Sequence, residues 1–438
     1  MQAFHAPMDA QTDATASLLT AAGWKQRLVF WSGAILVGLF VSALTLLSEQ
    51  AVVHLRAFFD RAPMSIWLIG PLGLTLTVWL TERWFPGAER SGVPQVKAAL
   101  AIHGDLTLRQ RFVSFPIAVG KVALTNLGLL AGASAGLGGP AIQIGASIMT
   151  TLGRAARFPP HYLERGFILA GSAAGFAALF SAPLAGIIFA IEELGREMEE
   201  KISSLVLTAI IFAGMTAYVI LNHYIFLETT EVAQPHGRAW LSIGYCGIAG
   251  GLAGGIFAFL LVRLGRRLSQ AGRRSRWALI VLSGLLLAAL ATVSEGQTLG
   301  TGYPMLKQIV NASQAASLWF PLEKGLATLI TALSGVPAGL FVPSLAVGAG
   351  LGADLHHWLP LAPLQTMVLL SMCAYFSGML QNPMTAFVLV MEMTDTHELL
   401  LPLMATAFVA TGTARLLNPR PLCEILTENY VRDLPQQA

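Results

Sequence analysis

The sequence predicts an all-α polytopic membrane protein composed of two repeated halves. Hydrophobic residues make up 55% of the 438 residues and charged residues only 12%, whereas a soluble globular domain has roughly twice that charged fraction. Several uncharged spans are long enough to cross a bilayer. In addition, three pairs of similar motifs occur in the same order along the chain. Together these three observations define the fold class.

The uncharged spans account for the predicted membrane helices. A transmembrane helix needs about 20 consecutive apolar residues. Some spans fit a single tilted helix, and the longer ones must contain two segments that fold back on each other. In chain order the spans are 28–48, 64–81, 122–153, 166–191, 239–262, 277–294, 325–353 and 358–391.

The charge distribution predicts the orientation of the chain. The loop 263–276 holds six arginines and no acidic residue, and the positive-inside rule places such a loop in the cytoplasm. Lys25 and Arg27 indicate the same side for the N-terminus. Nucleic-acid binding is a poor explanation for arginines fixed between two membrane spans. The predicted domains are a cytoplasmic leader without a secretory signal, 1–24, a transmembrane domain, 25–425, and a short cytoplasmic tail, 426–438.

Two other classes of protein are not supported by the residues present. Cys246, Cys373 and Cys423 are far apart in the sequence, so neither a disulfide framework nor a metal site is expected. An intramembrane enzyme would need a nucleophile with a buried base or paired acids. The only acidic pair at the membrane spans is Glu192 and Glu193, and no Ser/His arrangement lies at a plausible depth. We therefore do not expect an enzyme.

Internal repetition is the main organisational feature of the chain. Three pairs of similar motifs in the same order favour a duplicated unit, with halves of about 25–225 and 237–425. In the third pair, each proline precedes a glutamate by the same nine residues. The three pairs are 91-SGVP-94 with 301-TGYP-304, 136-GLGGPAIQIGA-146 with 339-GLFVPSLAVGA-349, and 182-APLAGIIFAIEE-193 with 382-NPMTAFVLVMEM-393.

The glycine- and proline-rich motifs predict broken helices that open a binding site. Proline suits the first turn of a helix, so the loops 136–140 and 339–343 should each start one. A helix N-terminus inside the bilayer presents unused N–H groups and about half a positive charge, and both favour an anion. Matching interruptions in two repeats indicate a transport site. The alternative is that these glycines only permit tight helix packing.

In order and spacing, these motifs resemble the chloride channel and chloride/proton antiporter (CLC) family. The resemblance rests on SGVP, GLGGP followed by QIGA, GSAAGFAALFSAPLAGIIFAIEE and GLFVP, and it covers about residues 25–425. It implies two inverted halves with many short tilted helices, a homodimer in the bilayer with one anion pathway per subunit, and cytoplasmic termini. It also implies a multi-pass protein of the bacterial inner membrane, with chloride as the transported ligand and no resident cofactor.

The resemblance assigns several residues to the anion pathway. Ser91 matches the serine whose hydroxyl coordinates the central halide, and serine there is typical of chloride-selective members. Leu340 and Phe341 match positions whose backbone N–H groups face that anion. Glu193 matches the internal glutamate that passes protons in the antiporters. For Glu193 we expect a structural or electrostatic role rather than a proton relay.

The start of the first glycine-rich helix departs from the family pattern. Gly139, Pro140 and Ala141 match the start of the helix that supplies N–H groups at the outer part of the chloride site. The family's gating glutamate would stand at Gly138, and no acidic residue lies between Asp105 and Glu164 to replace it. Gly138 also offers no side chain to fill the space.

Two further positions bear on the pathway. The family has a tyrosine donor in a PLY motif, whereas 421-PLC-423 places Cys423 there, and a thiol is only a weak donor. Tyr430 is an unlikely substitute. Lys121 is a lone cation at the border of a long apolar span. It either raises the electrostatic potential along the anion path or extends to the membrane interface.

These departures predict passive, weakly gated chloride conduction. A carboxylate that competes with chloride and carries a proton couples the two fluxes, and Gly138 removes it. One alternative is a coupled chloride/proton antiporter with another proton carrier. Another is a fluoride exporter of the same fold, although that branch usually replaces the serine found here at Ser91.

Overall fold

A computed structural model describes residues 21–102, 104–158, 165–195, 204–221, 226–227, 229, 232, 235–270, 272–311 and 317–432. Within these ranges the chain forms helices joined by turns and loops, and its β pairing is limited to one isolated bridge, between Gly136 and Gly339. Residues 1–20 of the predicted leader and 433–438 of the predicted tail lie outside them. The all-α class expected from the sequence is confirmed.

The first half of the chain contains one long helix and many short ones. In order they are α2 (Ala21–Arg61), η1 (Pro63–Ser65), α3 (Ile66–Trp84), α4 (Val93–Ala101), α5 (Leu106–Gln110), α6 (Phe115–Leu130), α7 (Gly138–Ala155), α8 (Phe167–Phe180), α9 (Pro183–Phe189), η3 (Ala190–Leu194) and α10 (Ser204–Ile220).

The second half repeats this mixture of helix lengths. Its helices are η4 (Gly237–Trp240), α11 (Leu241–Ser269), α12 (Arg273–Val293), α13 (Tyr303–Val310), α14 (Phe320–Ser334), α15 (Phe341–Trp358), α16 (Leu364–Leu380), α17 (Pro383–Thr394), η5 (His397–Leu399), α18 (Leu400–Arg415) and α19 (Leu422–Arg432).

The longest apolar spans are broken into pairs of helices, as predicted. The spans 122–153 and 166–191 divide into α6 with α7 and α8 with α9, and the second half divides its two long spans in the same way. Ser181 and Gln381 end α8 and α16 with φ values of 52° and 61°. A proline follows two residues later in each case and begins the next helix.

Five helices in the described ranges are long and apolar enough to cross a membrane. They are Trp24–Arg61, Pro63–Trp84, Leu106–Leu130, Gly237–Ser269 and Arg274–Val293. The other apolar helices in these ranges are shorter, among them Phe167–Phe180, Leu205–Ile220, Leu364–Leu380 and Pro383–Thr394.

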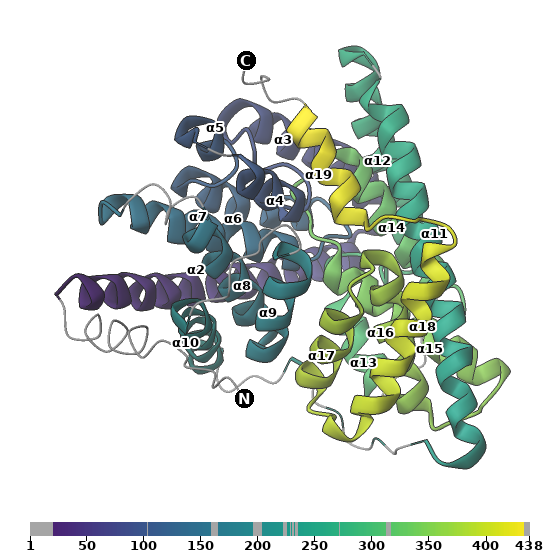
Figure 1. The fold of residues 1–438 in the computed structure, drawn as a ribbon. Helices are drawn as coiled ribbons and strands as arrows, with labels where there is room; N and C mark the ends of the chain where they lie inside the picture. The colour runs from purple at the N-terminus through teal and green to yellow at the C-terminus, as the bar shows by residue number, and fades with distance from the viewer. Residues whose placement is uncertain are drawn as a thin grey trace, which may run out of the picture.

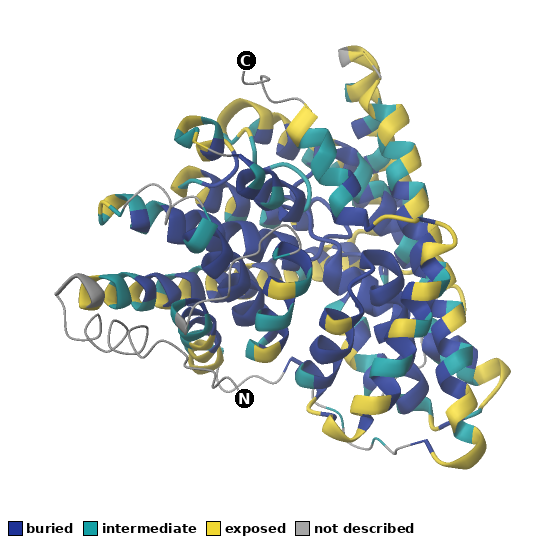
Figure 2. Ribbon diagram, viewed as in Figure 1, coloured by how far each residue is buried: buried dark blue, intermediate teal, exposed yellow. Residues whose placement is uncertain are grey.

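The two halves lie side by side, with α2–α10 on the left and α11–α18 on the right in Figure 1. The last helix, α19, returns to pack on α4 of the first half. The predicted domain boundary at residue 425 therefore falls inside a helix. Buried residues are concentrated where the halves meet, as Figure 2 shows.

Small residues allow the central helices to approach closely. A Cβ on Gly145 of α7 would overlap the carbonyl oxygen of Gly171 in α8, and one on Gly254 of α11 would lie 2.7 Å from the backbone nitrogen of Met379 in α16. Close backbone approach at small residues is the usual way to pack helices within a bilayer. Some glycines thus serve packing, as the alternative interpretation proposed, while others form the site described next.

Candidate functional site

The two glycine-rich motifs meet at the centre of the molecule. Gly136 donates its N–H to the carbonyl oxygen of Gly339 at 2.8 Å, and Gly339 donates to that of Gly136 at 2.8 Å. A side chain has no room at either position, because a Cβ on Gly339 would lie 2.7 Å from the Gly136 oxygen. The two motifs that match in sequence are therefore also paired in space.

Helices α7 and α15 begin directly after this bridge, and they begin in the same way. Leu137 and Leu340 are the N-cap residues, and neither makes a side-chain cap hydrogen bond. Pro140 and Pro343 occupy the third position of each helix and carry no N–H. Ala141 donates its N–H to Leu137 at 2.8 Å. Pro140 and Ala141, which belong to the predicted chloride-binding helix start, therefore have no free N–H group to offer an anion.

The amides that remain at these two helix starts form a candidate anion site. Gly138 and Gly139 hold the first two N–H groups of α7, and Phe341 and Val342 hold those of α15. A helix does not use these groups internally, and its dipole adds positive potential at the same end. Of the predicted pair Leu340 and Phe341, only Phe341 lies within the helix.

Ser91 lies against the start of α7. A Cβ added to Gly139 would overlap both the carbonyl oxygen and the hydroxyl oxygen of Ser91, so this close approach requires glycine. Ser91 and Leu340 also line one narrow cavity of about 60 Å³. The structure therefore brings Ser91, Gly139 and Leu340 together.

Lys121 holds the loop that precedes Ser91. Its Nζ donates to the carbonyl oxygens of Ala88 at 2.8 Å, Glu89 at 3.3 Å and Arg90 at 2.7 Å. The side chain is fully buried, so the alternative in which Lys121 extends to the membrane interface is not what the structure shows. A buried ammonium bonded to three carbonyl oxygens fixes this loop firmly.

The second half contains a counterpart that sequence analysis missed. Lys324 is also fully buried, and its Nζ donates to the carbonyl oxygens of Thr298 and Gly300 at 2.9 Å each. That loop precedes 301-TGYP-304, the partner of 91-SGVP-94. Its position in the sequence could have revealed it, because Lys324 precedes the motif at Gly339 by as many residues as Lys121 precedes the motif at Gly136.

The space beside Gly138 is filled rather than open, contrary to expectation. A Cβ on Gly138 would lie 2.5 Å from Cδ2 of Phe341. The ring of Phe341 is buried and packs edge-on against Phe376 at a centroid distance of 5.2 Å. An aromatic ring from the opposite helix start therefore covers the position at which the family carries its gating carboxylate.

The narrow cavity that reaches Ser91 has polar residues that sequence analysis did not select. Arg90, Arg266 and Asn429 line it, in addition to apolar side chains. Arg266 lies in the last turn of α11, within the arginine-rich segment 263–276, so the cavity lies on that side of the protein. That segment, expected to be a loop, is helical up to Ser269 and again from Arg273. Arg90 has a φ of 55°, a conformation that is uncommon for a residue with a side chain.

The C-terminal helix α19 contributes to this cavity through its second turn. Leu426 and Asn429 line the cavity. Cys423 is buried in the first turn and is not among the described residues that line it. Tyr430 packs against the ring of Phe112 at 5.9 Å and faces a neighbouring crevice.

A second cavity, of about 500 Å³, reaches the same helix starts from the other side. Leu137 and Val342 form its floor, and Glu49, Tyr303 and Lys307 stand around it. Glu49 lies in α2, and Tyr303 and Lys307 lie in α13, which α12 separates along the chain from the arginine-rich segment. The helix starts therefore lie between two cavities.

Glu193 is buried and paired rather than exposed at a helix end. Its carboxylate accepts a hydrogen bond from Lys97 Nζ of α4 at 2.7 Å, and another from the side-chain amide of Asn382. These contacts connect η3, which directly follows α9, to α4, the helix that follows Ser91, and to the start of α17. Neutralisation by Lys97 accounts for the burial of the carboxylate.

The neighbouring glutamates cap helices of the opposite half. Glu192 accepts hydrogen bonds from the backbone N–H groups of Met384 at 3.1 Å and Thr385 at 2.7 Å, at the start of α17. Glu392 accepts the equivalent bonds from Leu184 at 3.0 Å and Ala185 at 2.8 Å, at the start of α9. The third pair of sequence motifs is thus a pair of reciprocal caps.

Fold and site together define an all-α, multi-pass membrane protein whose two halves present paired helix starts suited to an anion. The sequence model of the voltage gated chloride channel family matches residues 73–415, most of the chain. The protein belongs to the voltage gated chloride channel (CLC) family.

Curated relatives are similar over most of their length. The chain is 28% identical over 397 residues to an H(+)/Cl(-) exchange transporter ClcA of Klebsiella pneumoniae subsp. pneumoniae, covering 85% of this chain and 82% of the relative. It is 29% identical over 395 residues to the H(+)/Cl(-) exchange transporter ClcA of Yersinia pestis, covering 85% and 80%.

Solved structures share the fold. A slow cyanobacterial Cl-/H+ antiporter superposes with a TM-score of 0.80 at 24% identity, covering 93% of this chain and 97% of the other. A CLC-type fluoride/proton antiporter gives 0.76 at 22% identity, covering 92% and 98%. These matches support the predicted CLC-type architecture.

Proposed function

We propose that this protein conducts chloride passively across the membrane, with weak gating and without stoichiometric proton coupling. The observation that carries the proposal is Gly138, which stands where the family's gating glutamate would be and has the ring of Phe341 beside it. Without that carboxylate, no group at this position exchanges a proton for an anion. No catalytic step and no cofactor are required.

The proposed anion path runs from the arginine side to the opposite cavity. Chloride enters past Arg90 and Arg266, meets the hydroxyl of Ser91, and passes the first-turn amides of α7 and α15. It leaves through the cavity that contains Lys307. Basic residues at both mouths raise the local anion concentration. Asn429 offers an amide donor on the helix where the family has its tyrosine.

Simultaneous chloride and proton flux from reconstituted vesicles tests this proposal. Wild-type protein should release chloride without moving protons uphill, and uphill proton movement driven by a chloride gradient would contradict the proposal. Gly138→Glu should slow chloride flux and make it pH-dependent. Gly138→Gln is the matched control, because it displaces the Phe341 ring equally but cannot ionise at this position.

Proton-coupled chloride exchange is the second candidate, and the names of the curated relatives favour it. Glu193 is held in an ion pair by Lys97 of α4, whereas Glu49 lines the second cavity, of about 500 Å³, at the helix starts. Glu49 is therefore the proposed alternative proton carrier. If coupling is measured, Glu49→Gln should abolish it. Fluoride export is less favoured, because the fluoride-exporting branch usually replaces the serine that is present here as Ser91. Measuring fluoride flux in the same vesicles tests this alternative.

We also propose that the protein is a homodimer in a bacterial inner membrane with cytoplasmic termini. The arginine-rich loop supports the orientation. An apolar face over α9, η3 and α17 supports the dimer: Leu184, Ile191 and Met384 are 53%, 52% and 44% exposed. The partly buried carboxylates of Glu192 and Glu392 lie beside them. Carboxylates on an apolar face are costly in contact with lipid, so a second copy covers this face.

A further inference from the structure

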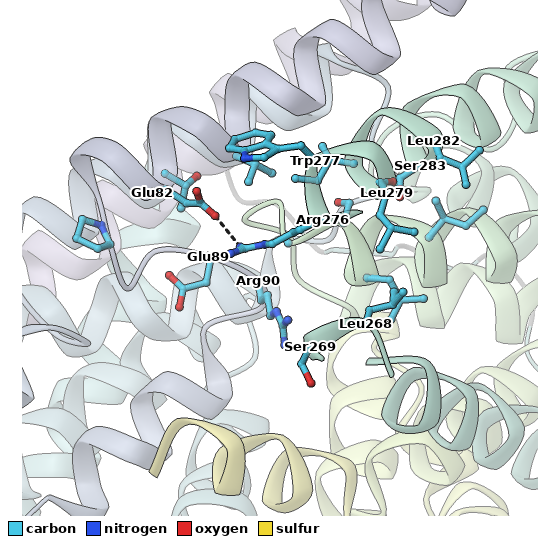
Figure 3. Close-up of a pocket in the computed structure, with 18 of the residues that line it drawn as sticks. Glu82, Glu89, Arg90, Leu268, Ser269, Arg276, Trp277, Leu279, Leu282 and Ser283 are labelled. Atoms are coloured by element: carbon cyan, nitrogen blue, oxygen red, sulfur yellow. Dashed lines mark hydrogen bonds and ion pairs between the residues drawn. The ribbon is translucent and has the colours of Figure 1, made fainter. Parts of the chain in front are cut away.

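A large crevice between α3, α12 and α14 is not part of the proposed anion path. Its volume is about 870 Å³. Helices α3 and α12 touch where a Cβ on Gly70 would lie 2.9 Å from the carbonyl oxygen of Gly284. Toward the arginine-rich loop the crevice extends between them as far as an ion pair of 2.7 Å between Arg276 and Glu82 (Figure 3).

The lining of the crevice changes character along its depth. Arg276 and Glu82 lie at the mouth, where Arg90 and Trp277 are also exposed to it (Figure 3). Deeper along α12 the lining is apolar and ends at Leu286. The ten residues from Arg276 to Leu286 span about 15 Å of helix, which equals the hydrocarbon thickness of one leaflet, half of about 30 Å.

The crevice is also accessible from the lipid. Leu282 and Leu286 line it and are still 48% and 44% exposed. Helix α12 is the least buried of the five membrane-length helices, with 28% of its apolar window buried in the protein. An apolar chain can therefore enter the crevice sideways from the bilayer.

Two arginines and two glutamates line the mouth, and Arg276 is ion-paired with Glu82, so Arg90 is the guanidinium left for an anionic headgroup. Within the described residues, the side chain of Arg90 makes no hydrogen bond or ion pair, although it lines both this crevice and the narrow cavity at Ser91. Glu89 is engaged with its own loop, since it accepts a hydrogen bond from the Gly87 N–H at 2.8 Å. Guanidinium groups bind phosphate oxygens with matched geometry, and basic pockets between membrane helices bind anionic lipids.

We propose that this crevice binds one anionic phospholipid per protomer. Its acyl chain lies along α12 between Ile280 and Leu286, and its phosphate lies between Arg90 and Arg276. The site shares Arg90 with the proposed anion path, but its acyl-chain part lies outside that path, and it does not depend on which ion the protein carries. Because Arg90 adjoins Ser91, the headgroup lies next to the inner mouth of that path.

Native mass spectrometry of the detergent-purified protein tests the proposal. With equimolar phosphatidylglycerol and phosphatidylcholine added, one phosphatidylglycerol should be retained preferentially per protomer. Arg90→Ala and Arg276→Ala should each lower retention roughly fivefold, the equivalent of about 1 kcal/mol per arginine near an anionic surface. Arg274→Ala is the matched control, because Arg274 is exposed on the same helix and does not line the crevice.

A second variant separates a lipid from a free anion. Ser283→Phe fills the apolar part of the crevice without changing its charge, so it should also abolish retention of phosphatidylglycerol. Equal retention of both lipids by the wild type, or full retention by the arginine variants, would overturn the proposal. So would displacement of the lipid by millimolar inorganic phosphate together with normal retention by Ser283→Phe.

Discussion

Gly139 is the residue at which the size of a side chain matters most for the proposed site. Its Cα faces the carbonyl and hydroxyl oxygens of Ser91, and both belong to groups that cannot move without disturbing the site. The loop carrying Ser91 is fixed by Lys121, so it cannot retreat from an added methyl group.

Gly139→Ala should therefore lower both chloride flux and stability. Overpacking of this kind costs about 1–3 kcal/mol. Gly412→Ala is the control, because nothing lies within 4 Å of a Cβ there and alanine favours a helix interior by up to about 1 kcal/mol. Thermal unfolding in detergent and chloride flux from vesicles measure the two effects. Equal behaviour of both variants would show that Ser91 does not constrain residue 139.

Individual side chains were predictable only where a motif marks them. Ser91 and Gly139 stand in repeated glycine-proline motifs, and the structure brings them together. Arg90 and Asn429 carry no such mark, because their places at the cavity result from a left-handed backbone and from the return of α19 across the molecule. Contacts of that kind join segments that are distant in the sequence, and a single sequence does not show which distant segments meet.

At the scale of elements, α9 and α17 depend on each other for their caps. A carboxylate from the end of each helix accepts two backbone N–H bonds from the start of the other. Both helices begin with proline after an N-cap that makes no side-chain cap bond, so the distant glutamates supply what the local sequence does not.

Removal of either cap should destabilise the contact between the halves. Glu192→Ala and Glu392→Ala should each cost about 1.5–3 kcal/mol, the range for hydrogen bonds to a charged group. Glu392→Gln, which retains an acceptor oxygen, should cost less. Because both caps lie in one interface, the double alanine variant should depart from additivity. Thermal unfolding measures all four variants, and strict additivity would argue that the caps act separately.

The elements themselves were largely predictable from hydropathy and from glycine and proline. The long uncharged spans divide into two helices each, as expected. The capping role of Glu192 was not predictable, because adjacent glutamates followed by a charged segment also fit an ordinary helix end. Only the matching spacing of Pro183 with Glu192 and of Pro383 with Glu392 pointed to a shared role, and spacing alone does not reveal which helix each carboxylate caps.

At the scale of the whole molecule, the proposed dimer makes the apolar face over α9 and α17 an interface. Leu184→Trp combined with Met384→Trp should weaken association, because each adds bulk beside a capping carboxylate. Val293→Trp, at a position 72% exposed on α12, is the control. Single-molecule photobleaching in vesicles counts the subunits. A wild-type protein that stays monomeric at every density would rule out this interface.

The reciprocal caps also order the events of synthesis in time. The N–H of Ala185 at the start of α9 donates to Glu392, 207 positions further along the chain. The N–H of Met384 at the start of α17 donates to Glu192, which was synthesised 192 positions earlier. The first half must therefore wait, with polar amides unsatisfied in an apolar setting, until nearly the whole chain has emerged. Because each half supplies the caps of the other, we expect that neither half reaches its final form alone.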